Sequence, residues 1–212
     1  MTLRGRWGVR WARACAVTGA ALLGALVAPL AAQGAAVAPA HTAADTRFFQ
    51  GMIAHHAQAV TMSAWVAART ERAPLRLLAE RITVSQRDEI RLMQQWLRDH
   101  EEAVPSADGT LPMPGPMDHG AMAAHGAHGA LHPGMLSPEE MQALEAATGD
   151  AFVRLFLAGM IKHHQGAITM VRELFAVPGA GQDPATFNLA SDIEADQTAE
   201  IARMRALLAT IR

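Results

Sequence analysis

The stretch that decides the fold is GMIAHHAQAVTM, residues 51–62, because the chain carries a close copy of it, GMIKHHQGAITM, at residues 159–170. When Phe48–Met62 is aligned with Phe156–Met170, nine of 15 positions agree, both histidines included. Adjacent residues of an α-helix point about 100° apart, so one patch of core cannot account for two neighbouring histidines. The repeated pair therefore indicates separate duties for the two rings.

A second pair of segments repeats as well. Five of 12 positions agree between residues 82–93, ITVSQRDEIRLM, and residues 193–204, IEADQTAEIARM. The chain therefore contains an internal duplication of one unit. Each unit reads as two helices, because apolar residues recur at helical spacing and there is almost no β pattern. The expected helices are 45–69 with Asp45 as N-cap, 74–102 opening on Pro74, 150–176, 184 to the C-terminus opening on Pro184, and a short helix at 137–147 begun by Ser137, Pro138 and Glu140.

Four long helices in a duplicated hairpin predict an all-α, antiparallel four-helix bundle. We expect residues 1–40 to be a signal peptide and disordered start, and residues 41–212 to form a single helical domain. Within that domain, repeat 1 covers 45–102, a Met/His-rich linker covers 103–136 and repeat 2 covers 137–212.

The first 40 residues have the composition of a secretion signal. Arg4, Arg6, Arg10 and Arg13 form a basic start without an acidic residue, and the apolar run Ala14–Leu30 is followed by alanine- and glycine-rich sequence. These flanks favour a cleaved signal over an uncleaved anchor, and the apolar run is short for a span, which needs about 20 residues. We therefore expect a secreted or periplasmic protein with no stable membrane span.

Removal of the signal changes the charge and the chemistry of the chain. It leaves 14 basic against 20 acidic residues and takes away Cys15, the sole cysteine. A negative chain lacks the basic surplus that neutralises phosphates, which argues against nucleic acid as a partner. Without cysteine there is no zinc finger, iron–sulfur cluster or cysteine nucleophile. Any metal must be held by histidine, methionine, carboxylate or amide groups.

The histidine motif places its polar and sulfur-bearing side chains on one helical face, and the Gln/Glu motif does the same on the partner helices. These faces should meet inside the bundle, where buried polar groups must be hydrogen-bonded or metal-bound. The candidate ligands are Met52, His55, His56, Met62, Met160, His163, His164 and Met170. The groups expected to support them are Gln86, Glu89, Met93, Gln197, Glu200 and Met204.

Two interpretations fit these faces. In the first, each histidine donates to Glu or Gln on the facing helix, the network fixes helix register, and the methionines fill gaps. In the second, imidazole and thioether groups hold a metal, with copper the best fit and zinc or another divalent ion possible. Glu89 and Glu200 would then orient the imidazoles or bind the metal themselves. The residues alone leave both interpretations open.

The linker supplies a further indication. MPGPMDHGAMAAHGAHGALHPGM, residues 113–135, holds four of the ten histidines in sequence that is mostly Gly, Ala and Pro. Histidine-rich tracts are a metal-binding composition, and mixed His and Met without Cys suits both Cu(I) and Cu(II). We therefore expect metal capture by His119, His125, His128, His132, Met117 and Met122.

The doubled MI-x-HH-x-x-A-[VI]-x-M, each copy followed by Q-x-x-E-I-x-x-M, resembles a bacterial family of ferritin-like helical proteins labelled as a domain of unknown function. The resemblance covers residues 45–102 and 150–212 and leaves out the linker. It implies a ferritin-like four-helix fold in a secreted or periplasmic protein. Because the family includes CopM-type periplasmic copper-binding proteins, it also implies copper binding through the histidines and methionines of the two motifs.

The expected function is copper sequestration, delivery or tolerance rather than catalysis, with a metallochaperone or an efflux component as a possible partner. Two alternatives stay open. One is a structural or interaction bundle whose buried His–Glu networks need no metal. The other is a metal-dependent oxidoreductase, which would require an open coordination position.

Overall fold

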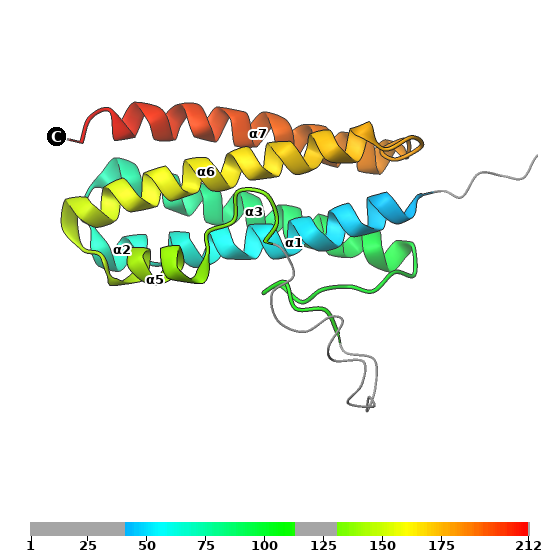
Figure 1. The fold of residues 1–212 in the computed structure, drawn as a ribbon, viewed down its shortest axis with the longest axis horizontal. Helices are drawn as coiled ribbons and strands as arrows, with labels where there is room; N and C mark the ends of the chain where they lie inside the picture. Colours follow the sequence, from blue (N-terminus) through cyan, green and yellow to red (C-terminus); the bar gives the residue numbers. More distant parts are fainter. Residues whose placement is uncertain (1–40, 113–130, 212) are drawn as a thin grey trace, which may run out of the picture. The chain divides into compact units, whose positions relative to one another are not determined.

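The two repeated units fold into two helical hairpins (Figure 1). The computed structural model describes residues 41–112 and 131–211, and these ranges contain helices, turns and loops without a strand. The predicted all-α bundle is thereby confirmed, whereas the predicted signal segment lies outside the described residues. The helices are α1 (Ala43–Ala64), α2 (Val66–Arg69), α3 (Ala73–Asp99), α5 (Pro138–Ala146), α6 (Gly149–Ala176) and α7 (Pro184–Leu208).

The helix starts follow local capping chemistry. The prediction of Asp45 as N-cap is wrong: Thr42 is the N-cap, and Asp45 is the third helical residue of a capping box. Thr42 Oγ1 accepts from the Asp45 amide at 3.3 Å, and the Asp45 carboxylate accepts from the Thr42 amide at 2.7 Å. The predicted capping box of Ser137 and Glu140 is confirmed. The predicted prolines also lie at helix starts: Pro184 is the first residue of α7, whereas Pro74 is the second residue of α3, which begins at Ala73.

Three predicted helix ends differ from the structure. The helix that begins at Pro184 ends at Leu208 and does not continue to the C-terminus. The first helix does not run unbroken to Arg69, because the Trp65 amide donates to the Met62 carbonyl at 3.3 Å, a tightened turn that separates α1 from α2. The third helix ends at Asp99 rather than Glu102. Glu101 takes a left-handed φ of 58°, and the Glu102 amide returns to the Leu97 carbonyl at 2.9 Å. This Schellman-type turn uses the last three residues to close the helix.

The hairpins pack as an antiparallel bundle. α1 lies along α3 and α6 lies along α7, while the two hairpins meet mainly where α6 packs on α1. α3 and α7 make fewer contacts with each other than either makes with its hairpin partner. In residues 41–112 and 131–211, no helix is long and apolar enough to cross a membrane.

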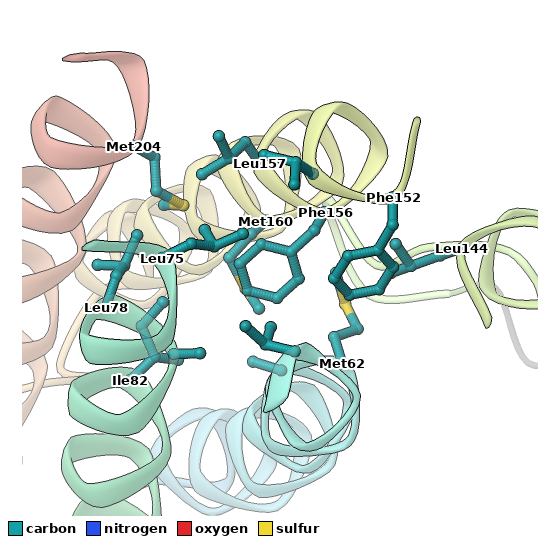
Figure 2. Close-up of a cluster of buried hydrophobic side chains, with 14 of the residues drawn as sticks. Met62, Leu75, Leu78, Ile82, Leu144, Phe152, Phe156, Leu157, Met160 and Met204 are labelled. Atoms are coloured by element: carbon teal, nitrogen blue, oxygen red, sulfur yellow. The ribbon is translucent and has the colours of Figure 1, made fainter. Parts of the chain in front are cut away.

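Two apolar clusters fill the bundle, and along every long helix a polar stretch separates them. In α1, for example, Met52 belongs to one cluster and Met62 to the other, with the histidine pair between them. Figure 2 shows the first cluster, in which aromatic and sulfur-bearing side chains of α6 face α1, α3 and α7. The first cluster includes Met62, Met160, Met204, Leu75, Ile82 and Phe156. The second includes Met52, Met93, Met170, Phe49, Leu97 and Ile193.

Replacement of Phe156 tests how much this packing contributes. Phe156 has no exposed surface, so Phe156→Ala should lower the free energy of unfolding by about 3–5 kcal/mol through lost burial and a residual cavity. Chemical denaturation of the metal-free protein measures the change. The matched control is Leu92→Ala, since Leu92 is 57% exposed and should change stability by about 0.5 kcal/mol or less. Equal losses in both variants would contradict this account of the core.

Candidate metal site in the histidine layer

A polar layer lies between the two apolar clusters. We call it the histidine layer, and it contains His55 and His56 of α1, Gln86 and Glu89 of α3, His163 and His164 of α6, and Gln197 and Glu200 of α7. All four histidines have no exposed surface, and the four Gln and Glu side chains are also buried. The duplicated spacing explains the arrangement, because equivalent positions of the two hairpins reach the same height in the bundle.

One histidine of each pair contacts the glutamate of its own hairpin. His56 Nε2–H donates to Glu89 Oε2 at 2.5 Å, and His164 Nε2–H donates to Glu200 Oε2 at 2.7 Å. Ser85 Oγ supports the first carboxylate by donating to Glu89 Oε1 at 3.1 Å. The two hairpins thus build the same outer His–Glu contact.

The other histidine of each pair lies at the junction of the hairpins. The rings of His55 and His163 have centroids 3.8 Å apart and planes inclined by 37°. His163 Nε2–H donates to the backbone carbonyl of His55 at 2.9 Å, and His55 Nε2–H donates to the carbonyl of Pro133 at 2.9 Å. The two central imidazoles therefore touch, and the rings of His56 and His164 have centroids 6.4 Å from His55 and 6.1 Å from His163, respectively.

The hydrogen bonds fix the tautomer of every ring. Each Nε2 faces an oxygen that can only accept, so every ring carries a proton on Nε2, and in the neutral form of a ring the lone pair lies on Nδ1. The four Nδ1 atoms are buried and have no hydrogen-bond partner among the described residues. In a neutral ring such an Nδ1 atom holds a lone pair without a hydrogen-bond donor, and neutral imidazole nitrogen can bind a metal.

Burial keeps the central pair neutral. Desolvation lowers the pKa of His55 to about 3, with the charge of His56 as the next cause. Desolvation also holds the pKa of His163 well below its usual value, and the neighbouring charge of His55 acts in the same direction. Protons therefore do not compete for these Nδ1 atoms at neutral pH.

The last residues of the linker cross the bundle at His55, whose ring donates to the Pro133 carbonyl. We call residues 131–136 the strap. Gln58 fixes it by donating to the Leu136 carbonyl at 3.0 Å and accepting from the Leu136 amide at 2.8 Å. A Cβ at Gly166 would lie 1.8 Å from the Pro133 carbonyl oxygen, so only glycine allows the strap this close to α6.

The strap is a part of the site that the motif analysis missed. The signal is present where the repeats disagree, because Gln58 of the first motif aligns with Gly166 of the second. Gln58 hydrogen-bonds to the strap, and its equivalent Gly166 leaves the space that the strap occupies. The Pro133 carbonyl could not have been identified from composition, because backbone acceptors leave no mark in the sequence.

The other predicted ligands lie in three places. The candidate methionines flank the histidine layer, with Met52 and Met170 in one apolar cluster and Met62 and Met160 in the other. Met93 and Met204, expected as supporting groups, divide between the clusters in the same way. His132 belongs to the strap. The predicted linker ligands His119, His125, His128, Met117 and Met122 lie outside the described residues.

The nitrogen and oxygen ligands are not gathered into a ready-made cage. Within the described ranges, no three His, Cys, Asp or Glu side chains are placed to hold one metal ion. Gln86 has both amide atoms buried without a partner, and Gln197 has its Oε1 in the same state. The layer therefore contains unused donors and acceptors next to the lone pairs, and methionine sulfur borders it on both sides.

Comparison with known proteins agrees with this architecture. A family model described as a domain of unknown function, DUF305, matches residues 45–208. Among solved structures, a DUF305 fragment from Deinococcus radiodurans is 28% identical, with a TM-score of 0.62, over 80% of this chain and 97% of that one. A DUF305 protein from Streptomyces coelicolor that is thought to be secreted is 29% identical, with a TM-score of 0.62, over 81% of this chain and 94% of that one.

CopM in its Cu(II)-bound form is also similar to this chain, with 28% identity and a TM-score of 0.56 over 78% of this chain and 95% of CopM. A Cu(I)-bound form of CopM has likewise been solved. Among curated sequences, the uncharacterized protein L153 of Acanthamoeba polyphaga mimivirus is 39% identical over 57 residues, which span 27% of this chain and 38% of that protein. The family match covers most of the chain, which therefore belongs to the DUF305 family.

Proposed function

We propose that this chain is a secreted or periplasmic metal-binding protein whose histidine layer binds copper. The observation that carries the proposal is the set of four buried Nδ1 atoms without hydrogen-bond partners. An interior polar atom without a partner is costly, so its persistence calls for an explanation. Coordination of a metal ion supplies one for the whole set.

The surrounding chemistry favours copper. Imidazole nitrogen suits copper and zinc alike, whereas thioether sulfur selects Cu(I), and Met52 and Met62 flank the first histidine pair on both sides. A Cu(I) ion brings a single positive charge into this apolar setting, which costs less than a divalent ion. Glu89 and Glu200 would orient the outer rings through Nε2–H, as carboxylates do beside metal-bound histidines.

The family relationship supports the same metal. CopM, a relative of similar fold, has been solved with Cu(I), Cu(II) and Ag bound. The corresponding role for this chain is copper sequestration, delivery or tolerance. The Met/His-rich linker would act as an accessory capture arm, and a metallochaperone or efflux component would be the exchange partner.

A second candidate is a purely structural layer. It is favoured by one observation: the Nε2 of each of the four layer histidines already has an acceptor without any metal. Such a network would fix the register of the helices and stabilise the bundle. The two functions differ in which ring nitrogen matters, since structure needs the Nε2–H donor and metal binding needs the Nδ1 lone pair.

Replacement of histidine by glutamine distinguishes the two functions. The glutamine amide N–H2 can replace the Nε2–H donor, but glutamine has no lone pair at the position of Nδ1. The double variant His55→Gln/His163→Gln should weaken tight Cu(I) binding by more than about 100-fold, the upper cost of losing only an outer-shell partner. Competition titration with a Cu(I) chelator measures the affinity. His100→Gln, outside the layer, is the matched control and should bind copper as the original chain does.

Variants at His55 and His163 can also exclude one of the two functions. His55→Ala/His163→Ala removes both nitrogens and should lower the melting temperature of the metal-free protein, whereas the glutamine variant should retain most of it. If the glutamine variant kept the copper affinity and stoichiometry of the original chain, the copper proposal would be wrong and the structural layer would stand.

Acid should destabilise the metal-free protein through the central pair. Unfolded histidines take up protons below about pH 6.5, while burial lowers the folded-state pKa of His55 to about 3 and also lowers that of His163. Stability is therefore fully present above pH 6.5 and falls as pH drops toward 3, by about 1.4 kcal/mol per pH unit for each histidine. Denaturation at pH 7, 6 and 5 measures the slope. His55→Gln/His163→Gln should flatten it, and an unchanged slope would show that the rings are not desolvated.

A further inference from the structure

A pocket opens beside the strap, at the edge of the histidine layer. It has a volume of about 260 Å³, and its lining includes Arg47 and Phe48 of α1, His132 and Pro133 of the strap, and Met170 and Glu173 of α6. It therefore collects an imidazole, a thioether and a carboxylate from two segments that are far apart in the sequence. Neither repeat motif predicts this combination.

The imidazole and the sulfur are both held in place. A Cβ at Gly51 would lie 2.7 Å from Cε1 of His132, so the ring packs against α1 at a position where glycine has no side chain to obstruct it. Met170 is buried, with 7% of its surface exposed, and Glu173 is exposed at the rim. An imidazole and a thioether favour a soft monovalent cation such as Cu(I), and the nearby carboxylate adds a compensating charge.

The pocket is connected to the layer by covalent and packing contacts. Pro133, the residue after His132, accepts the hydrogen bond from His55 at 2.9 Å. Met170 belongs to the apolar cluster that also contains Met52 and Met93 and that borders the layer. Because the four layer histidines have no exposed surface, an ion must pass a bordering group before it reaches them.

We propose that His132, Met170 and Glu173 form an outer binding site for a soft monovalent cation, through which the ion enters the histidine layer. This inference rests on the proposed function of the layer. Entry proceeds by ligand exchange, in which the ion leaves the His132 nitrogen and the Met170 sulfur as it binds Nδ1 of the buried rings. The oxidation state does not change, and no bond other than metal–ligand bonds forms or breaks.

The test uses Ag(I), which has the charge and softness of Cu(I) without its redox chemistry. The starting protein is the full chain with His119, His125, His128, Met113, Met117 and Met122 replaced by alanine, so that these six linker side chains cannot bind the probe. His132→Gln/Met170→Leu removes the outer site, and leucine conserves the volume of methionine. His100→Gln/Met141→Leu is the matched control, with the same two changes away from the pocket.

Stopped-flow mixing with Ag(I) measures the rate of uptake. The outer-site variant should fill its histidine layer about tenfold more slowly, at the lower end of the range by which a charge-focusing cleft raises on-rates. The single variant His132→Gln keeps every candidate ligand of the layer, so it should slow uptake without changing the final affinity of the layer, because an entry site alters the rate and not the end state. The control should fill at the original rate, and equal rates in all three proteins would overturn the proposal.

Equilibrium binding separates this inference from the function of the layer. In the starting protein with His55→Gln/His163→Gln added, one weaker Ag(I) equivalent should remain, and His132→Gln/Met170→Leu should abolish it. If the original layer bound no silver while this equivalent persisted, the proposed function would fail and the outer site would stand alone. If the equivalent survived His132→Gln/Met170→Leu, the outer site would be wrong while the layer remained.

Substitution of Arg47 should change cation affinity and uptake rate in the opposite direction. Its guanidinium lines the same pocket and is exposed, so it disfavours a cation there. Arg47→Gln should tighten the outer site and speed uptake, whereas Arg81→Gln, on α3 away from this pocket, should do neither. Weaker binding by Arg47→Gln would contradict the placement of the ion.

Discussion

Four buried imidazoles each require a hydrogen-bond acceptor, and this requirement determines how the bundle is arranged. Because the four rings have no exposed surface, each must donate its Nε2 proton to a protein oxygen, and the acceptor oxygens lie on α3, α7, α1 and the strap. Helix register, the crossing of α1 and α6, and the course of the strap all satisfy this one requirement. The apolar clusters on both sides supply most of the burial, yet they are less specific about which residue faces which.

The two halves share a motif and still differ in chemistry. His56 and His164 make equivalent contacts with Glu89 and Glu200, as expected from a duplication. His55 and His163 do not, because His163 donates to the neighbouring helix while His55 donates to the strap. A segment outside the repeats therefore makes the central pair asymmetric.

The sequence predicted the parts of this structure that depend on periodicity. Apolar spacing gave the long helices, and the doubled motifs placed His55, His163 and the Gln/Glu positions on facing surfaces. It failed where a single local interaction decides: the cap moved from Asp45 to Thr42, and the helix broke at Trp65. The strap could not be foreseen, since a backbone carbonyl and the space above a glycine have no periodic signature. Which nitrogen of each ring stays free likewise depends on three-dimensional contacts.

The difference between Gln58 and Gly166 has a consequence for the symmetry of the molecule. A bundle of two identical hairpins would present the same residue at both positions. Two glutamines would block the crossing segment, and two glycines would leave no side chain to hydrogen-bond to it. The strap therefore requires two unlike halves, so the repeated fold can bind this segment on one face only if its internal symmetry is broken.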